Sequence, residues 1–342
     1  MTRVLVARLD SVGDVLLSGP AVRAIAAGAD EVWMLCGPTG APAAELLPGV
    51  DRVLTWAAPW IVSPAPPFTP ESAEELAGLI AECRPDSAVI LTSFHQSPLP
   101  LAAMLRLAGV SRIAGASVDH AGSLLDVRLT PGEDFPEDQP EALRALAIAG
   151  AAGFPAPPDD RLAVRDLPDV SDLVPDGPYV VVHPGASVPA REWPAGHHRR
   201  LTEELSERGR TVLVTGTPAE AELTARVAGS RGIDLGGRTD LHGLAGILAG
   251  ADAAVVGNTG PAHLAAAVGT PIVSLFSPVV PAVRWAPWGV PTIVLGDQEA
   301  ACRGSRARVC PVPGHPCLSQ VDPATVADAC ERLISETEGA QR

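Results

Sequence analysis

The chain has 342 residues, of which 46% are hydrophobic, so it is long enough for two domains with buried cores. Its formal net charge of −15 argues against nucleic acid as a partner, because phosphate contacts require clustered cations. All 25 basic residues are arginine, which excludes chemistry through a lysine Schiff base.

The N-terminus begins directly with an apolar segment, without the basic region and cleavage site of a signal peptide. We therefore expect a cytoplasmic protein, in which the six cysteines are thiols. No uncharged apolar run reaches the roughly 18 residues that a spanning helix needs. We expect no transmembrane segment, and peripheral contact with a membrane stays open.

Short buried strands alternate with helical patterns in the first half of the chain, as in a parallel α/β sheet. Prolines interrupt this pattern in two expected loops, 56–70 and 133–140. The first 165 residues are therefore predicted to form a doubly wound, Rossmann-like domain. The expected strands are 4–9, 32–35, 53–55, 87–91 and 112–114, and the expected helices are 15–25, 41–47, 71–83, 99–107 and 141–152.

Prolines recur every few residues from 154 to 178, where we place the interdomain linker. The alternation then restarts and predicts a second doubly wound domain over residues 166–342. The closing helix, 323–335, fits on either domain. The expected strands are 179–182, 211–214, 233–235, 253–256 and 272–276, and the expected helices are 195–208, 218–227, 241–248 and 261–268.

Gly13 and Asp14 follow the first strand, which places this carboxylate at the carboxyl edge of the sheet, where α/β proteins bind ligands. The alternative is that Asp14 only complements the positive end of a helix. Gly13 is the only glycine of a G-x-G-x-x-G pattern at this turn. A nicotinamide dehydrogenase is therefore disfavoured.

A comparable turn follows the strand that ends near His183. Gly185 permits close approach of the backbone, Ser187 offers a hydroxyl, and Arg191 offers a forked cation that suits phosphate oxygens. Arg191 is alternatively a solvated surface cation. Trp193 is interpreted as a packing residue.

Three further residues belong to the helices that follow. Glu220 lies early in its helix and has the chemistry to accept hydrogen bonds from ribose hydroxyls, although capping explains an acid there equally well. His197 and His198 are expected at the surface.

The turn from Gly257 to Pro261 joins a buried strand to a helix that starts at a proline. Backbone N–H groups at such a helix N-terminus form an anion site, and Asn258 or Thr259 is the expected cap. The alternative is an ordinary strand–turn–helix unit.

Metal ligands are not indicated. There is no D-x-D pair to hold a divalent ion on a diphosphate. Cys302, Cys310, His315 and Cys317 depart from the paired short spacings of zinc sites, so we expect a thiol-containing surface loop.

Three segments together resemble glycosyltransferase family 9, the ADP-heptose heptosyltransferases. They are Arg8 to Asp14, His183 to Pro194 and Asn258 to Ala267. The resemblance is weaker between about residues 30 and 178. It implies an α/β GT-B fold in which two Rossmann-like domains face a central cleft. The N-terminal domain would bind the acceptor and the C-terminal domain an ADP-sugar, for inverting transfer without a metal or other cofactor.

The resemblance also implies residue roles. Asp14 would be the general base, and Arg8 and Gly13 would contact the acceptor, although Arg8 is alternatively the ion-pair partner of Asp10 or Asp14. Asn258 stands where many members of the family have aspartate, and Arg191 stands where lysine is common. On the donor side, Ser187, Arg191, Thr259 and Gly260 would bind the diphosphate, Glu220 the ribose, Thr239 the adenine, Asn258 the transferred sugar and His263 phosphate or sugar.

The leading hypothesis is a glycosyltransferase that moves heptose or a related sugar from ADP to a hydroxyl. The acceptor would be a glycan, similar to a lipopolysaccharide core, or a small natural product. The alternatives are a nucleotide-sugar 2-epimerase of the same architecture and a non-catalytic sugar-nucleotide-binding protein.

Overall fold

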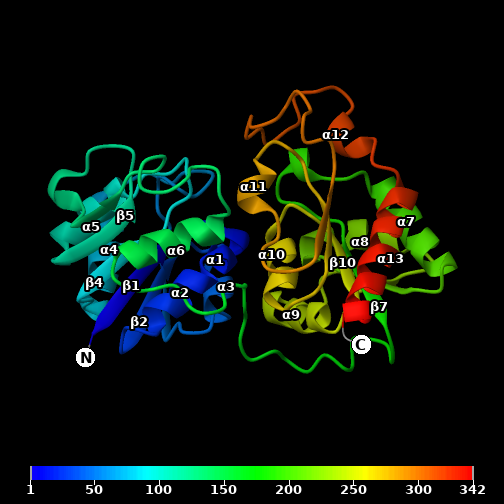
Figure 1. Cartoon of the computed structure of the whole chain (residues 1–342), viewed down its shortest axis with the longest axis horizontal. Helices are drawn as coiled ribbons and strands as arrows, with labels where there is room; N and C mark the ends of the chain where they lie inside the picture. Colours follow the sequence, from blue (N-terminus) through cyan, green and yellow to red (C-terminus); the bar gives the residue numbers. More distant parts are fainter. Residues whose placement is uncertain (1, 341–342) are drawn as a thin grey trace. The chain divides into compact units, whose positions relative to one another are not determined.

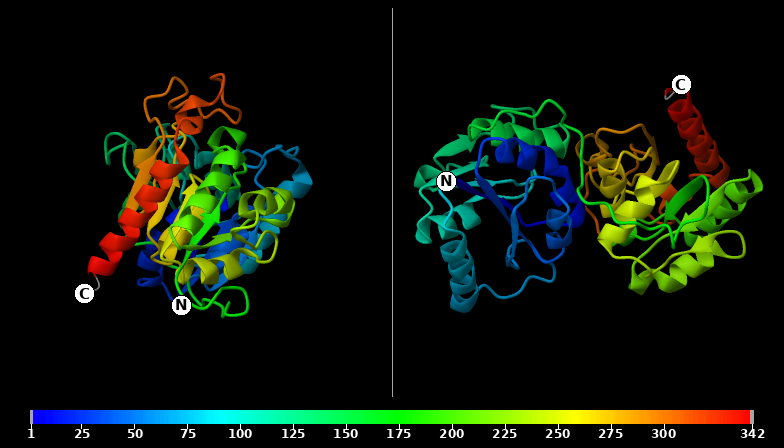
Figure 2. Two further views of the ribbon diagram at one scale, coloured as in Figure 1. Left: turned by 90° about the vertical axis from the view of Figure 1, so that its right-hand side faces the viewer. Right: turned by 90° about the horizontal axis from the view of Figure 1, so that it is seen from below.

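The computed structural model describes residues 2–340, and the chain divides into two compact units between Arg165 and Asp166 (Figure 1). Each unit has a six-stranded parallel sheet with helices on both faces (Figure 2). No helix within the described range is long and apolar enough to cross a membrane.

The first sheet has the strand order β3-β2-β1-β4-β5-β6, with every neighbouring pair parallel. The chain reverses its direction of winding between β1 and β4, and α/β proteins bind ligands beyond the carboxyl ends of the strands at this point. The strands are β1 (Arg3–Arg8), β2 (Glu31–Cys36), β3 (Arg52–Thr55), β4 (Ser87–Ile90), β5 (Arg112–Ala116) and β6 (Val127–Leu129).

Helices cover both faces of this sheet, because both faces of its central strands are apolar. Helix α2 packs on α6 over one face, and α4 and α5 cover the other. The helices are α1 (Val12–Leu17), α2 (Gly19–Ala26), α3 (Ala41–Glu45), α4 (Pro70–Cys83), α5 (Leu99–Leu107) and α6 (Glu141–Ala151), with a 3₁₀ turn, η1 (Gly122–Leu124).

The helix expected over 15–25 is two helices, α1 and α2. Pro20 lies in the first turn of α2 and has no backbone N–H to continue the hydrogen bonding of α1. Ser18 caps the end of α1 and donates from its hydroxyl to the carbonyl of Asp14 (3.0 Å). The break leaves Asp14 in a short helix directly after β1.

The second sheet repeats the same order, β12-β11-β10-β7-β8-β9, so its reversal point lies between β7 and β10. Its strands are β7 (Tyr179–His183), β8 (Thr211–Val214), β9 (Ile233–Asp234), β10 (Ala253–Gly257), β11 (Ile272–Leu275) and β12 (Thr292–Leu295).

Helices α7 and α13 lie side by side on one face of the second sheet, and α9 and α10 lie together on the other (Figures 1 and 2). The closing helix α13 therefore belongs to the second unit. The helices are α7 (Ala195–Glu207), α8 (Ala221–Ala228), α9 (Leu241–Ala249), α10 (Gly260–Ala267), α11 (Ala282–Trp285), α12 (Pro316–Ser319) and α13 (Pro323–Ala340), with 3₁₀ turns η2 (Pro189–Arg191) and η3 (Pro218–Glu220).

Two expectations about exposure were wrong. His198 is buried, because α7 turns it to the same side as Leu201 and Leu205, and its ring packs against Trp193 with centroids 4.7 Å apart. The cysteine-containing loop is not a surface feature throughout, because Cys302 and Cys317 are buried in the core of the second unit. Trp193 is buried, as expected for a packing residue.

Candidate active site

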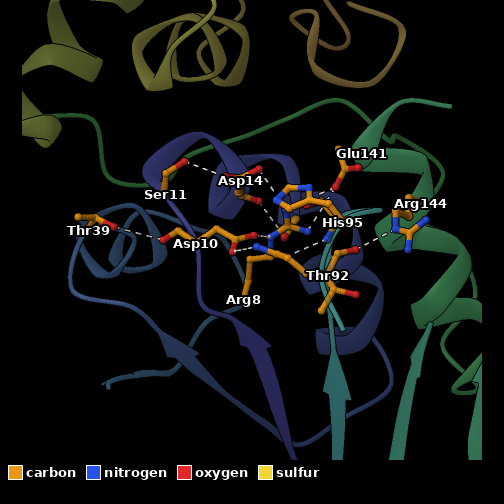
Figure 3. Close-up of polar contacts among 12 residues, drawn as sticks. Arg8, Asp10, Ser11, Asp14, Thr39, Thr92, His95, Glu141 and Arg144 are labelled. Atoms are coloured by element: carbon orange, nitrogen blue, oxygen red, sulfur yellow. Dashed lines mark hydrogen bonds and ion pairs between the residues drawn. The ribbon is translucent and has the colours of Figure 1, made fainter. Parts of the chain in front are cut away.

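A buried cluster of charges lies at the carboxyl end of β1, next to the reversal point of the first sheet (Figure 3). Arg8 is the last residue of β1 and only 2% exposed. Its Nε lies 2.8 Å from Asp10 Oδ2, and its Nη2 lies 3.0 Å from Asp14 Oδ1 and 3.4 Å from Glu141 Oε2. One guanidinium thus contacts three carboxylates from three parts of the chain.

Asp14 is the carboxylate of this cluster that also reaches solvent, with 20% of its side chain exposed. Its Oδ1 accepts a hydrogen bond from Arg8, and its Oδ2 accepts one from the hydroxyl of Ser11 (2.8 Å). These two bonds fix the orientation of the carboxylate. Asp14 is also the acidic residue in the first turn of α1, so the helix-end explanation and a chemical role are compatible.

Burial changes the protonation of the other members of the cluster. It raises the pKa of Asp10 to about 6, although Arg8 lowers it, and it raises the pKa of Glu141 to about 7 against the same opposing charge. Burial also opposes the charge on Arg8, but the neighbouring carboxylates outweigh this effect and raise its pKa. Arg8 therefore stays cationic, while Glu141 titrates near neutral pH.

Residues from β4 and its loop complete this edge of the sheet. Asp10 accepts a hydrogen bond from the amide of Gln96, and the carbonyl of Thr92 accepts one from Arg144 Nε (2.8 Å). A small recess lies here, lined by Asp10, Trp60, Thr92 and Gln96 among others. Apart from Asp10, these residues were missed by the sequence analysis.

In the second unit, Arg191 connects the turns after β7 and β10, the two strands at the reversal point. Its Nη1 donates to the carbonyl oxygen of Asn258 (3.2 Å). Arg191 is partly buried, so it is not the solvated cation of the alternative interpretation.

The turn after β10 leads directly into the N-terminus of α10. Thr259 is the N-cap of α10, but its side chain does not cap the helix, contrary to expectation. Asn258 is 4% exposed, and its Oδ1 accepts a hydrogen bond from the N–H of Ser277 (3.4 Å). Its Nδ2 has no hydrogen-bond partner among residues 2–340. Backbone donors and a cation thus meet at this turn.

Glu220 lies against the turn after β7. A side chain at Gly185 would place its Cβ 1.9 Å from Glu220 Oε1, so the absence of a side chain there makes this approach possible. Glu220 Oε2 accepts hydrogen bonds from the N–H and the hydroxyl of Thr217, both 2.8 Å long. The capping explanation of Glu220 is therefore correct for one of its two oxygens.

The other expected donor residues lie along the same unit. Ser187 is exposed, Thr239 is half-buried just before the Asp240 cap of α9, and His263 is buried within α10. His183, at the end of β7, bonds through Nδ1 to the Thr215 hydroxyl (3.0 Å), and burial lowers its pKa to about 4.

No three His, Cys, Asp or Glu side chains in the described part of the chain are grouped to hold a metal ion. The cysteines within this range are all free thiols.

Two units of Rossmann strand order, each with polar groups at its reversal point, form an α/β protein of the GT-B fold. The family profile described as glycosyltransferase family 9 (heptosyltransferase) matches residues 99–314. The chain therefore belongs to glycosyltransferase family 9.

Two curated relatives agree with this assignment. Lipopolysaccharide heptosyltransferase 1 of Pseudomonas aeruginosa is 34% identical over 208 residues, which cover 59% of this chain and 58% of the relative. Lipopolysaccharide heptosyltransferase 1 of Escherichia coli is 33% identical over 132 residues, 38% of this chain and 39% of the relative. The chain thus spans less than three fifths of the length of these relatives.

The fold is similar over the whole chain to a family 9 glycosyltransferase from Veillonella parvula, with a TM-score of 0.78, 17% identity and 98% of each chain covered. It is also similar to E. coli ADP-heptose lipopolysaccharide heptosyltransferase II, with a TM-score of 0.76 and 20% identity over 99% of this chain and 100% of that one.

Proposed function

We propose that this chain transfers heptose, or a related sugar, from an ADP-sugar to an acceptor hydroxyl, with inversion and without a metal ion. The observation that carries the proposal is the position of Asp14, a partly exposed carboxylate held by Arg8 and Ser11 at the reversal point of a Rossmann sheet. The ADP-heptose named for the E. coli structure supports the choice of donor.

In this mechanism the acceptor oxygen attacks the anomeric carbon as the bond from that carbon to the diphosphate oxygen breaks. Asp14 takes the acceptor's proton, and ADP leaves with the bonding electron pair. A carboxylate suits this role because the hydroxyl becomes acidic as its oxygen attacks. The product has the opposite anomeric configuration because a single displacement occurs.

We assign Arg8 to Asp14 rather than to the acceptor. Arg8 is buried and contacts three carboxylates, so its charge is already neutralised within the protein. Its bond to Asp14 keeps this carboxylate ionised and oriented before the reaction. Gly13, Thr92 and Gln96 lie along the same edge and are proposed to contact the acceptor.

The second unit is proposed to bind the donor. Arg191, Ser187, Thr259 and Gly260 would hold the diphosphate and stabilise the charge that develops on leaving ADP. Glu220 would contact the ribose through the oxygen that its cap leaves available. Thr239 would lie beside the adenine, and Asn258 and His263 beside the transferred sugar.

A thermal-shift panel tests the choice of donor. The purified chain is heated with ADP-, UDP-, GDP- or dTDP-sugars in the presence of a chelator. A ligand that binds only the folded chain at 100 times its Kd stabilises it by about 2.7 kcal/mol. We expect a rise in Tm with ADP-sugars alone, and a rise only with UDP-sugars would overturn the donor assignment.

Arg191 provides a second test. Replacing it by methionine should weaken ADP binding by about 10- to 100-fold, because a hydrogen bond to a charged group contributes about 1.5–3 kcal/mol. Arg191→Lys should recover part of the affinity, since it keeps the charge but not the fork. The measurement is calorimetric titration with ADP.

Arg199→Met is the matched control for this variant, because Arg199 is exposed on α7 and pairs with Glu203. Equal ADP affinity in the Arg191 and Arg199 variants would remove Arg191 from the diphosphate site.

A further inference from the structure

Glu141 begins α6 and lies far from Asp14 in sequence, yet it contacts the same guanidinium nitrogen. Its side chain is 1% exposed, and its Oε2 lies 3.4 Å from Arg8 Nη2 and 3.5 Å from Nη1. The same Nη2 lies 3.0 Å from Asp14 Oδ1. Asp14 and Glu141 therefore share one cation, and they lie close enough for the charge of Asp14 to raise the pKa of Glu141.

The surroundings of Glu141 contain little else to neutralise it. Its Oε1 is buried and has no hydrogen-bond partner in the described part of the chain. Arg144, one turn further along α6, lowers the pKa of Glu141, but it donates to the Thr92 carbonyl and lies 3.5 Å from Glu137. Asp10 and Asp14 add negative charge from the loop after β1 and from α1, and His95 extends toward the cluster from the loop after β4 (Figure 3).

We propose that Glu141 is a positioning residue that sets the proton affinity of Asp14 through their shared partner Arg8. The inference rests on the proposed role of Asp14 as the base. When Glu141 is ionised, its charge repels that of Asp14, and its carboxylate competes with Asp14 for the hydrogen bonds of Arg8. Asp14 therefore accepts a proton more readily. When Glu141 is protonated, the charge of Arg8 acts mainly on Asp10 and Asp14, and Asp14 is the weaker base. No proton passes between the two carboxylates.

Burial raises the pKa of the Glu141 carboxyl to about 7, so this carboxyl gains or loses its proton near neutral pH. The rate of transfer should therefore rise with pH through a step near neutrality that belongs to Glu141. Since rate follows the strength of the base, the step should be about tenfold in kcat/KM.

Glu141→Gln tests this proposal, because glutamine keeps the shape and an acceptor oxygen for Arg8 but carries no charge. We expect the near-neutral step to disappear and kcat to be about tenfold lower than in the unmodified chain at about pH 8, with the donor KM unchanged. Glu137→Gln is the matched control, since Glu137 contacts Arg144 and is 35% exposed. An unchanged pH profile in Glu141→Gln, or an equal change in Glu137→Gln, would overturn the proposal.

A stability measurement separates this inference from the proposed function. A carboxyl whose pKa is raised by folding stabilises the fold below its unfolded pKa, and this contribution is lost as pH rises through the folded pKa. The Tm of Glu141→Gln relative to the unmodified chain should therefore increase between about pH 5 and about pH 8. A constant difference would show that Glu141 does not titrate here and would overturn the inference.

The two readouts fail in distinguishable ways. If the unmodified chain transfers no sugar from any donor, the proposed function fails and Asp14 loses its role, whatever the stability curves show. If transfer proceeds and only the step in the pH profile persists in Glu141→Gln, the proposed function stands and the role of Glu141 fails.

Discussion

Asp14→Asn should lower the turnover number by about 10²–10⁴-fold, the range over which a positioned general base accelerates a reaction. Asparagine has the shape of aspartate and keeps an oxygen for the hydrogen bond from Arg8 Nη2. It lacks the basicity to take a proton from a hydroxyl. Turnover is measured as ADP released from an ADP-sugar in the presence of a panel of sugar acceptors.

The binding of ADP should not change in this variant, because the proposed donor residues belong to the second unit. Asp119→Asn is the matched control: Asp119 follows β5 at the same edge of the sheet and is exposed. Wild-type turnover in Asp14→Asn would remove Asp14 from the role of base. A parallel loss in Asp119→Asn would point to a general electrostatic effect of this edge.

Most of the two sheets could be predicted from the sequence, because a parallel strand buried on both faces is a continuous apolar run. β1, β4, β7 and β10 are of this kind. β6 and β12 were missed because they are short edge strands whose residues are mostly half-buried, so they lack both the apolar run and a strict alternation.

Because β6 was not predicted, Glu141 was not recognised as part of the site. The carboxyl end of β6 lies at the same edge of the parallel sheet as the carboxyl end of β1, and α6 is the next helix in the chain after β6. Without β6, Glu141 could only be interpreted as an acid in the first turn of a helix. Asp14 could be placed at the edge because its strand was evident. The contact of Arg8 with Glu141, 133 residues away, depends on tertiary structure that no local pattern encodes.

Arg8 contacts all three carboxylates of the cluster. Its replacement should therefore destabilise the fold more than the replacement of any other residue in the cluster. Arg8→Met leaves Asp10 and Glu141 buried without their common counter-ion. Removing one partner of a buried ion pair costs about 3–5 kcal/mol, a large part of the 5–15 kcal/mol that stabilises a typical domain. The loss of stability is measured by differential scanning calorimetry, from the first unfolding transition.

The loss should depend on pH in a definite direction. Burial already raises the pKa of Asp10 to about 6 and that of Glu141 to about 7, and without the opposing charge of Arg8 both should rise further. At about pH 5 the two carboxyls then take up protons and the unpaired charge disappears, whereas at about pH 8 they must ionise or the fold must open. The deficit in Tm of Arg8→Met should therefore be small at the lower pH and large at the higher one.

Arg52→Met is the control for Arg8→Met: it removes the same charge, but from an exposed position. Arg52 belongs to the same sheet and pairs with Glu82 at 2.6 Å, but its side chain is 55% exposed, so its loss should cost about 0–1 kcal/mol at either pH. Adding Glu141→Gln to Arg8→Met should restore part of the stability at the higher pH, because it removes one of the two buried carboxylates that lack a counter-ion. A deficit that is equal at both pH values, or that the second substitution does not relieve, would mean that Arg8 supports the fold by packing alone.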